Sequence, residues 1–177
     1  MIKKTKFDNL LIINHKFNFD NRGEFSEIFR KNLIEKELDY SFNFCQENLV
    51  NSSKNVLRGL HFQKNPNAQS KLISVFSGKI LDIAVDIRKN SETYGKYFST
   101  YLSSNDNMSL FIPKGFAHGY VSLENNTLVS YKVDNYYDPD SEYGIPYDDK
   151  HLNIDWGVDY NDLVISEKDK NYDNYVW

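Results

Sequence analysis

The chain has 177 residues, of which 40% are hydrophobic, 26% charged and 15% aromatic. This is the balance of a globular protein, and the length suffices for one sizeable core, so we expect a single domain over residues 1–177. The formal net charge of −4 provides no basic field to hold a polyanion, which argues against a nucleic-acid partner.

The longest early apolar run, Leu10–Ile13, is bounded by asparagine on both sides. It is too short for the core of a signal peptide or for a membrane span, so we expect no membrane partner. Cys45 is the only cysteine, which fits a reducing compartment and excludes a disulfide scaffold or a multi-cysteine zinc site. A cytoplasmic location is the simplest expectation.

The next two segments contrast in pattern. Phe25–Leu38 is the only good helix candidate near the amino terminus. Phe42–Asn48, if it is a strand, places two phenylalanines and then two amides, Gln46 and Asn48, on one face. That face is either a strand end emerging into solvent, which the segment alone favours, or a cavity mouth where amides bind a polar ligand.

The segment Asn55–Gln63 carries an arginine, a histidine and a glutamine inside an apolar, strand-like stretch. Burying such groups without partners costs on the order of several kcal/mol, so protein or ligand must satisfy them. His61 alone is more simply a hydrogen-bonded structural histidine than a catalytic one. We expect no metal site, because Gln63 stands where metal-binding cupins repeat a histidine and no glutamate follows before Glu92.

Alternation of apolar and polar residues in short runs dominates from about residue 42 to 133, which predicts antiparallel strands. In Lys79–Ile87, four apolar side chains alternate with a set that contains Asp82 and Asp86, the pattern of a half-buried strand. Similar runs occur at Lys71–Phe76, Tyr97–Leu102, Met108–Ile112, Gly119–Leu123 and Thr127–Val133. Many short strands at this spacing predict a sandwich or barrel with low helix content.

Within Thr127–Val133, Tyr131 shares a face with two valines, so its hydroxyl is expected to point into the interior. Such a tyrosine is usually a core residue with one hydrogen bond, but it can also act as a general acid beside an enolate. The following Asp134–Pro139 clusters aromatics at a strand end, where a ring could stack on a base or simply form a surface patch. A second short helix is expected near Leu163–Lys170, where Ser166 and Asp169 suit a helix end or a turn.

Eight segments carry a further pattern in order along nearly the whole chain. They are Asp20–Glu27, Gln46–Asn48, Val56–Gln63, Lys71–Leu72, Asp82–Arg88, Ile112–Gly119, Tyr131–Lys132 and Ser166–Asp169. Together they resemble the dTDP-4-dehydrorhamnose 3,5-epimerase family, the RmlC-like cupins. The resemblance implies an all-β cupin jelly roll, an antiparallel double-sheet barrel with a few short helices. It also implies a homodimer, neither metal nor redox cofactor, and a nucleotide-linked 4-keto-6-deoxy sugar as substrate.

The chemistry of such a substrate explains the residue types. A keto group at C4 acidifies the C–H bonds at C3 and C5, so inversion needs a base on one face, an acid on the other and a group that holds the enolate oxygen. By resemblance, His61 is the base and Asp169 the carboxylate that orients it, as in half of a catalytic triad. Lys71 resembles the cation beside the enolate, and Tyr131 the acid. No external cofactor is needed, and the chain contains no dinucleotide-binding glycine motif or P-loop.

The resemblance also assigns substrate-binding residues. Arg58 and Arg22 correspond to contacts with the pyrophosphate and the nucleotide, since guanidinium pairs bidentately with phosphate. Tyr136 corresponds to an aromatic that stacks on the base. The remaining matched positions are Gln46, Asn48 and His118, which line the pocket, together with Glu27 and Glu142. In the family the N-terminal strand crosses to the partner subunit, so Arg22, Phe25 and Glu27 are expected to serve the neighbouring site.

Three departures from the family pattern bear on the substrate. Glu24 replaces a common aromatic, Tyr143 stands where arginine is usual after Glu142, and Asn171–Trp177 differs from the usual tail. We expect conversion of dTDP-4-dehydro-6-deoxyglucose to dTDP-4-dehydro-L-rhamnose. The alternatives are C3-only or C5-only inversion, or another nucleotide sugar such as a GDP-linked 4-keto-6-deoxyheptose. A non-catalytic sugar-nucleotide binding module is disfavoured because all four chemical groups are retained.

Overall fold

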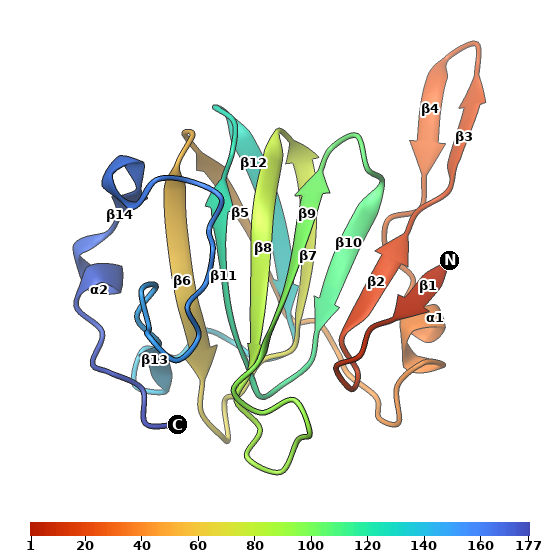
Figure 1. The fold of residues 1–177 in the computed structure, drawn as a ribbon. Helices are drawn as coiled ribbons and strands as arrows, with labels where there is room; N and C mark the ends of the chain where they lie inside the picture. The colour runs from red at the N-terminus through yellow and green to blue at the C-terminus, as the bar shows by residue number, and fades with distance from the viewer.

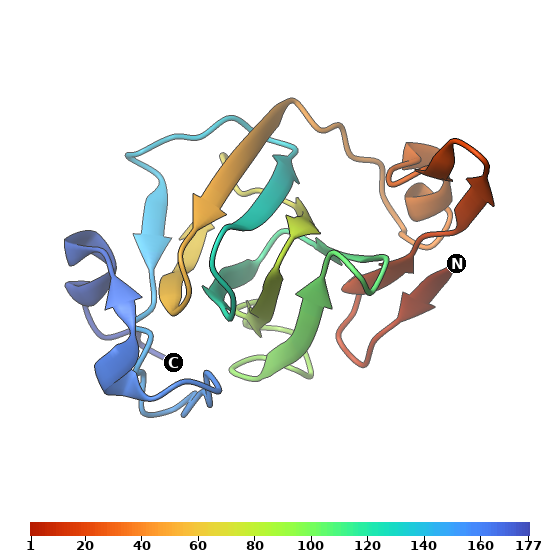
Figure 2. The same cartoon turned by 90° about the horizontal axis from the view of Figure 1, so that it is seen from above.

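The computed structural model describes residues 1–177 as two facing antiparallel sheets (Figures 1 and 2). The first sheet has the order β1 (Ile2–Lys4), β2 (Leu11–Asn14), β10 (Met108–Ile112), β7 (Lys71–Ser77), β12 (Thr127–Val133) and β5 (Gln46–Ser52). The second has the order β13 (Glu142–Gly144), β6 (Val56–Gln63), β11 (Phe116–Ser122), β8 (Lys79–Asp86) and β9 (Tyr97–Ser103), and β14 (Val164–Ile165) pairs parallel with β6. The predicted all-β jelly roll is confirmed.

Most predicted strands lie where the alternation places them. The runs Met108–Ile112 and Thr127–Val133 coincide with β10 and β12. The prediction over Phe42–Asn48 is wrong in its first half, because β5 begins only at Gln46. Phe42 instead packs in a separate apolar cluster against Phe111, with ring centroids 5.2 Å apart. Burial of these aromatic rings, rather than a strand face, explains the apolar residues there.

The helix expected over Phe25–Leu38 is largely wrong. The chain there first completes a hairpin of β3 (Phe17–Asp20) and β4 (Gly23–Ser26), and only Lys31–Glu35 forms a helix, α1. The hairpin turn is closed by the Asp20 carboxylate, which accepts from the Arg22 N–H at 2.8 Å, and Gly23 adopts a φ of +125° that favours glycine. This turn chemistry overrides the apparent helical spacing of the apolar residues that follow.

Near the carboxyl end, the predicted helix is shorter than expected. A 3-10 turn at Tyr160–Asp162 and β14 precede the helix α2, which covers only Glu167–Lys170. Ser166 is its N-cap and accepts from the Asp169 N–H at 3.1 Å, as its residue type predicted. Neither of the two α-helices has the length and apolar character needed to cross a membrane.

The strand β8 is buried on both faces, so the prediction of a half-buried strand is wrong. Its inner face lies in the apolar cluster between the sheets, and its outer face is covered by a C-terminal segment that contributes the fully buried Trp156. The two acidic side chains are therefore enclosed and paired. Asp86 accepts from Arg88, Ser91 and Thr93, while Asp82 pairs with a histidine described below.

Candidate active site

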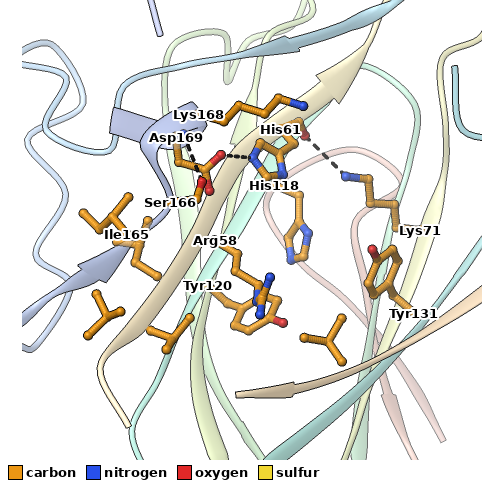
Figure 3. A pocket seen from close by; sticks show the side chains of 14 residues that line it. Arg58, His61, Lys71, His118, Tyr120, Tyr131, Ile165, Ser166, Lys168 and Asp169 are labelled. Carbon is orange, nitrogen blue, oxygen red and sulfur yellow. Dashed lines mark hydrogen bonds and ion pairs between the residues drawn. The ribbon is translucent and has the colours of Figure 1, made fainter. Parts of the chain in front are cut away.

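Two adjoining hollows of about 500 and 390 Å³ lie between the sheets, and His61, Lys71 and Tyr131 line both. Figure 3 shows the residues that line the first. His61 comes from β6 of the second sheet, whereas Lys71 and Tyr131 come from β7 and β12 of the first. Asp169 reaches the first hollow from α2. The fold therefore brings together all four residues that the resemblance assigned to the chemistry.

His61 and Asp169 form a hydrogen-bonded pair, with His61 Nε2 2.7 Å from Asp169 Oδ1. The other carboxylate oxygen accepts from the backbone N–H of Gly59 at 3.2 Å. Burial acts to raise the pKa of Asp169, but the bonds from His61 and Gly59 outweigh it and hold the pKa below its usual value. In the His61 tautomer whose Nε2–H donates to Asp169, Nδ1 is left as the basic nitrogen.

Gly59 is needed for this arrangement. Its φ is +115°, and a Cβ at this position would lie 2.5 Å from Gly119 Cα on the adjacent strand. The residue thus allows β6 and β11 to approach closely where the pairing register between them shifts. The backbone of β6 can then donate to Asp169 two residues before His61 presents its ring.

Lys71 lies beside His61 at the start of β7. Its Nζ donates to the His61 carbonyl oxygen at 3.3 Å, and only 9% of the residue is exposed. Burial lowers the pKa of Lys71 to about 8, although the charges of Asp82 and Glu142 oppose the shift. The ammonium group is therefore charged at neutral pH and poorly hydrated, the state in which a cation stabilises a nearby anion most strongly.

Tyr131 faces the cavity from the sheet opposite His61 (Figure 3). Burial raises the pKa of its phenol, although the charge of Arg58 opposes the shift. The hydroxyl is therefore protonated at neutral pH. A base on one wall and a protonated phenol on the other can exchange protons at opposite faces of a ring bound between them.

A second histidine–carboxylate pair lies deeper in the second sheet. His118 Nε2 on β11 is 2.9 Å from Asp82 Oδ2 on β8, and both side chains are almost fully buried. Burial lowers the pKa of His118 even though Asp82 opposes it, so the imidazole is neutral. Sequence reasoning placed His118 in the pocket but missed Asp82 as its partner. The available signal was an acid inside an otherwise apolar strand.

The mouth of the second hollow carries the predicted amides. Gln46 donates to Asn48 at 3.0 Å and accepts from the backbone N–H of Tyr137 at 3.0 Å. The Tyr137 hydroxyl donates to Glu142 at 2.7 Å, and Lys168 forms an ion pair with the same carboxylate. The cavity-mouth interpretation of the amides is thus the one that the geometry favours. Neither Tyr137 nor Lys168 was singled out from the sequence.

Of the two residues that the resemblance assigned to the nucleotide part of the substrate, Arg58 lines the cavity and Tyr136 does not. Arg58 lines the first hollow, where its Nε donates to Ser52 at 3.3 Å. Tyr136 is 70% exposed and lines neither hollow. Across the molecule, no group of three or more histidine, cysteine, aspartate or glutamate side chains is placed to hold a metal ion.

The N-terminal hairpin β3–β4 extends away from the sandwich, and its residues do not reach the cavity of their own chain (Figure 1). Arg22 pairs with Asp20 at 2.6 Å, and Glu27 pairs with Arg30 at 2.6 Å. Phe25 is 69% exposed. The three predicted binding residues of this segment therefore lie outside the cavity that holds His61 in their own chain.

The C-terminal tail covers the outer side of the His61 pair. The Tyr172 ring meets the His61 ring edge-on, with centroids 5.9 Å apart and planes at 70°. Gly144 permits this contact, because a Cβ there would overlap the Tyr172 ring. The tail is anchored by Trp177, which stacks on His151 and donates to the Asp149 carboxylate at 3.2 Å. No feature of the sequence pointed to this covering role.

Comparisons with known proteins agree with the predicted resemblance. The family model for dTDP-4-dehydrorhamnose 3,5-epimerase matches residues 4–175. The dTDP-4-dehydrorhamnose 3,5-epimerase of Methanothermobacter thermautotrophicus is 43% identical over 170 residues, which cover 96% of this chain and 91% of that protein.

Solved structures give the same result. The dTDP-4-dehydrorhamnose 3,5-epimerase from Elizabethkingia anophelis is similar with a TM-score of 0.95 at 39% identity, covering 99% of this chain and 96% of that one. The dTDP-6-deoxy-D-glucose-3,5-epimerase of Legionella pneumophila, in complex with dTDP-4-keto-L-rhamnose, has a TM-score of 0.89 at 41% identity, covering 96% and 89%. The match over nearly the full length, in sequence and in fold, shows that this chain belongs to the dTDP-4-dehydrorhamnose 3,5-epimerase family.

Proposed function

We propose that this chain is an isomerase that inverts C3 and C5 of dTDP-4-dehydro-6-deoxyglucose to give dTDP-4-dehydro-L-rhamnose. One observation carries the proposal: the His61–Asp169 pair and Tyr131 line one cavity from opposite sheets, with Lys71 beside them. The activity named for the similar proteins supports the choice of substrate. The single, unpaired Cys45 supports action in the cytoplasm.

Each inversion requires a balanced pair of proton transfers. His61 Nδ1 removes the proton from the carbon next to the C4 ketone, and Asp169 stabilises the imidazolium that forms. The electron pair of the broken C–H bond passes to the ketone oxygen as an enolate, which the Lys71 ammonium stabilises. Tyr131 then donates its phenolic proton to the opposite face of the same carbon. His61 must lose its proton and Tyr131 regain one before the second carbon reacts.

Substrate binding is assigned to groups around the same hollows. Arg58 supplies a guanidinium for the diphosphate, because guanidinium nitrogens pair well with phosphate oxygens. His118 lies on the wall of the first hollow, and Gln46, Asn48 and Glu142 surround the mouth of the second. We assign the nucleotide base to the exposed Tyr136, which precedes Tyr137 of the second hollow in the chain. All of these groups belong to the protein, so the proposed reaction uses no external cofactor.

We further propose a homodimer in which the hairpin β3–β4 completes the partner's site. The support is its projection from the sandwich with Phe19 and Phe25 exposed by 74% and 69%, since large exposed apolar side chains mark interaction surfaces. Mixing two inactive variants tests this exchange. His61→Asn keeps a working hairpin, and a variant with Arg22→Ala and Phe25→Ala keeps a working His61. Activity restored on mixing is the expected result, whereas hairpins that serve their own chain would restore none.

The reaction itself is tested by proton NMR of the protein with dTDP-4-dehydro-6-deoxyglucose in D₂O. We expect the signals at C3 and C5 both to disappear as deuterium enters. Loss of only one signal would identify a single-centre epimerase. Loss of neither, with tight binding of the sugar nucleotide, would indicate a binding module, and the GDP-linked 4-keto-6-deoxyheptose would then be tried in the same assay.

A further inference from the structure

Tyr120 is a buried tyrosine to which neither the sequence nor the proposed mechanism assigns a role. It lies on β11 with only 4% of the residue exposed, and its hydroxyl forms no hydrogen bond of good geometry in the chain; Ser52, a polar neighbour, already accepts from Arg58. Buried hydroxyl groups are nearly always hydrogen-bonded, because leaving one unpaired forfeits its interaction with water. Tyr120 lines the same hollow as His61, Lys71 and Tyr131, so its hydroxyl is available to a molecule bound there.

The surroundings of Tyr120 indicate what kind of group that partner is. Tyr120 pairs directly with Arg58 across strands β11 and β6, and both residues line the 500 Å³ hollow. Arg58 is exposed and donates within the chain only from Nε, to Ser52, so its two terminal nitrogens have no partner in the protein. Figure 3 shows the Tyr120 hydroxyl beside the Arg58 guanidinium at the end of the hollow away from Asp169. The Tyr120 hydroxyl and the terminal nitrogens of Arg58 are thus neighbouring donors on the same wall of the hollow.

The protonation state of Tyr120 suits a donor. Burial raises the pKa of its phenol to about 12, although the charge of Arg58 opposes the shift. The hydroxyl therefore keeps its proton at neutral pH. A phenol O–H beside a guanidinium forms a site for oxygen atoms that carry negative charge or lone pairs, and bonds from such a pair are charge-assisted.

We propose that Tyr120 is a substrate-binding residue, because its hydroxyl and the terminal nitrogens of Arg58 together hold one oxygen-rich group of the sugar nucleotide. This inference rests on the proposed function. The group is either a phosphate oxygen or an oxygen of the sugar, and both accept hydrogen bonds. Tyr120 differs in role from Tyr131, which faces the cavity from the opposite sheet next to Lys71.

The variant Tyr120→Phe tests the inference, because it removes only the hydroxyl. Calorimetric titration with dTDP and with dTDP-glucose is expected to show binding at least about tenfold weaker for one or both ligands. The melting temperature of the ligand-free variant is expected to stay equal or rise, since an unpaired buried hydroxyl is lost. A purely structural hydroxyl would do the opposite, lowering the melting temperature and leaving affinity unchanged. Tyr101→Phe, at a half-exposed position on β9 outside the hollows, is the matched control and should change neither.

The two ligands separate the two sources of oxygen. Weaker binding of both dTDP and dTDP-glucose assigns the hydroxyl to a phosphate, whereas weaker binding of dTDP-glucose alone assigns it to the sugar. If Tyr120→Phe binds both ligands as tightly as the unmodified chain, the inference is wrong while the proposed function stands. If the unmodified chain binds neither ligand, the proposed function fails and the inference fails with it.

Discussion

The two histidine–carboxylate pairs have nearly the same geometry and very different surroundings. Their N–O distances are 2.7 Å for His61–Asp169 and 2.9 Å for His118–Asp82. The side chain of His61 is 29% exposed in the cavity wall, whereas that of His118 is only 8% exposed. A base that turns over must exchange its proton with substrate and solvent, which the first position allows and the second hinders. Both histidines are paired with a carboxylate, so it is the greater exposure of His61 that suits it to act as the base, while the buried His118 stays neutral and donates a hydrogen bond.

The two carboxylates differ as well. Asp169 uses both oxygens, one for His61 and one for the Gly59 N–H. Asp82 is fully buried and leaves Oδ1 without a partner. Its charge instead acts on the buried Lys71, whose pKa it helps to hold up. In the His61–Asp169 pair, the carboxylate can therefore stabilise a proton gained by the imidazole. In the His118–Asp82 pair, the carboxylate instead places a negative charge near the ammonium group of Lys71.

The largest expected effect comes from replacing each histidine with asparagine. His61→Asn removes the base, so we expect exchange at C3 and C5 to fall by about 10²–10⁴-fold, measured by NMR in D₂O. His118→Asn leaves the base in place and should retain far more exchange, but it takes from buried Asp82 the hydrogen bond of a neutral imidazole and should lower the free energy of unfolding by about 1–3 kcal/mol. Equal loss of exchange in the two variants, with His118→Asn still folded and binding dTDP, would contradict the division of roles.

Lys71 lies between the two pairs and gives the next largest effect. Lys71→Met should lower kcat by about 10²–10³-fold at pH 7, as expected for loss of an oxyanion-stabilising group. Because burial lowers the pKa of Lys71 to about 8, its charge is present below that pH and lost above it. In the unmodified chain kcat/KM should therefore fall as the pH rises through about 8. Lys71→Arg stays charged, so it should remove this high-pH decline, and a decline that persists in this variant would assign it to another group.

The parts of the fold that could be predicted from the sequence are those that depend on local patterns. Alternation is a local property, so strands such as Met108–Ile112 and Thr127–Val133 are recovered from it. The hairpin turn at Asp20 is also local, but its effect on the following residues is not, and the helix expected there was mostly wrong. Regular spacing predicts a repeating element only where no turn or tertiary contact overrides it.

Site residues follow the same logic. His61 and Asp169 are 108 positions apart, so no spacing rule joins them, and only the family resemblance brought them together. Alternation puts Asp82 on the face of β8 that we expect to be polar, but that face carries Ile80 and Ala84 into the core between the sheets, and packing between sheets cannot be seen in the strand itself. Tyr120 was not singled out because an aromatic in an apolar run is ordinary core. Its importance depends on which donors remain unpaired, which only the packed structure reveals.

The buried pair should also appear in the pH dependence of stability. Burial lowers the pKa of His118 below the value of about 6.5 that an unfolded histidine has, so near and below that pH the unfolded chain binds more protons. The free energy of unfolding should therefore be highest above pH 6.5 and decrease on acidification. Urea unfolding of the unmodified chain and of His118→Asn between pH 7.5 and 5 measures this.

His15 contributes with the same sign, because burial lowers its pKa too. Only the difference between the two chains is therefore assigned to the buried pair. We expect that difference to shrink as the pH falls, and His61→Asn serves as a matched variant that retains His118. A difference that is constant with pH would mean that His118 does not resist protonation in the folded chain.

The smallest expected effect lies on the outer side of the His61 pair, where the Tyr172 ring contacts the imidazole. Tyr172→Ala should open this side and lower kcat by about threefold to tenfold with little change in KM, because a better hydrated pair interacts less strongly. Tyr172→Phe keeps the ring and removes a hydroxyl that has no partner, so its kcat should match that of the unmodified chain. Steady-state kinetics of the two variants separates the ring from the hydroxyl.

Gly144→Ala tests the same contact independently, because its Cβ would overlap the Tyr172 ring and push the ring away from His61. The sequence of the tail is unchanged in this variant. Gly144→Ala should reproduce the kcat loss of Tyr172→Ala, while Val176→Ala, at an 86% exposed position of the tail, should not. If Tyr172→Phe loses as much activity as Tyr172→Ala, the hydroxyl rather than the ring is the active feature. The activity of the His61–Asp169 pair would then depend on a polar contact of the Tyr172 hydroxyl and not on shielding from water. The two histidine–carboxylate pairs would in that case differ in their hydrogen bonds and not only in their burial.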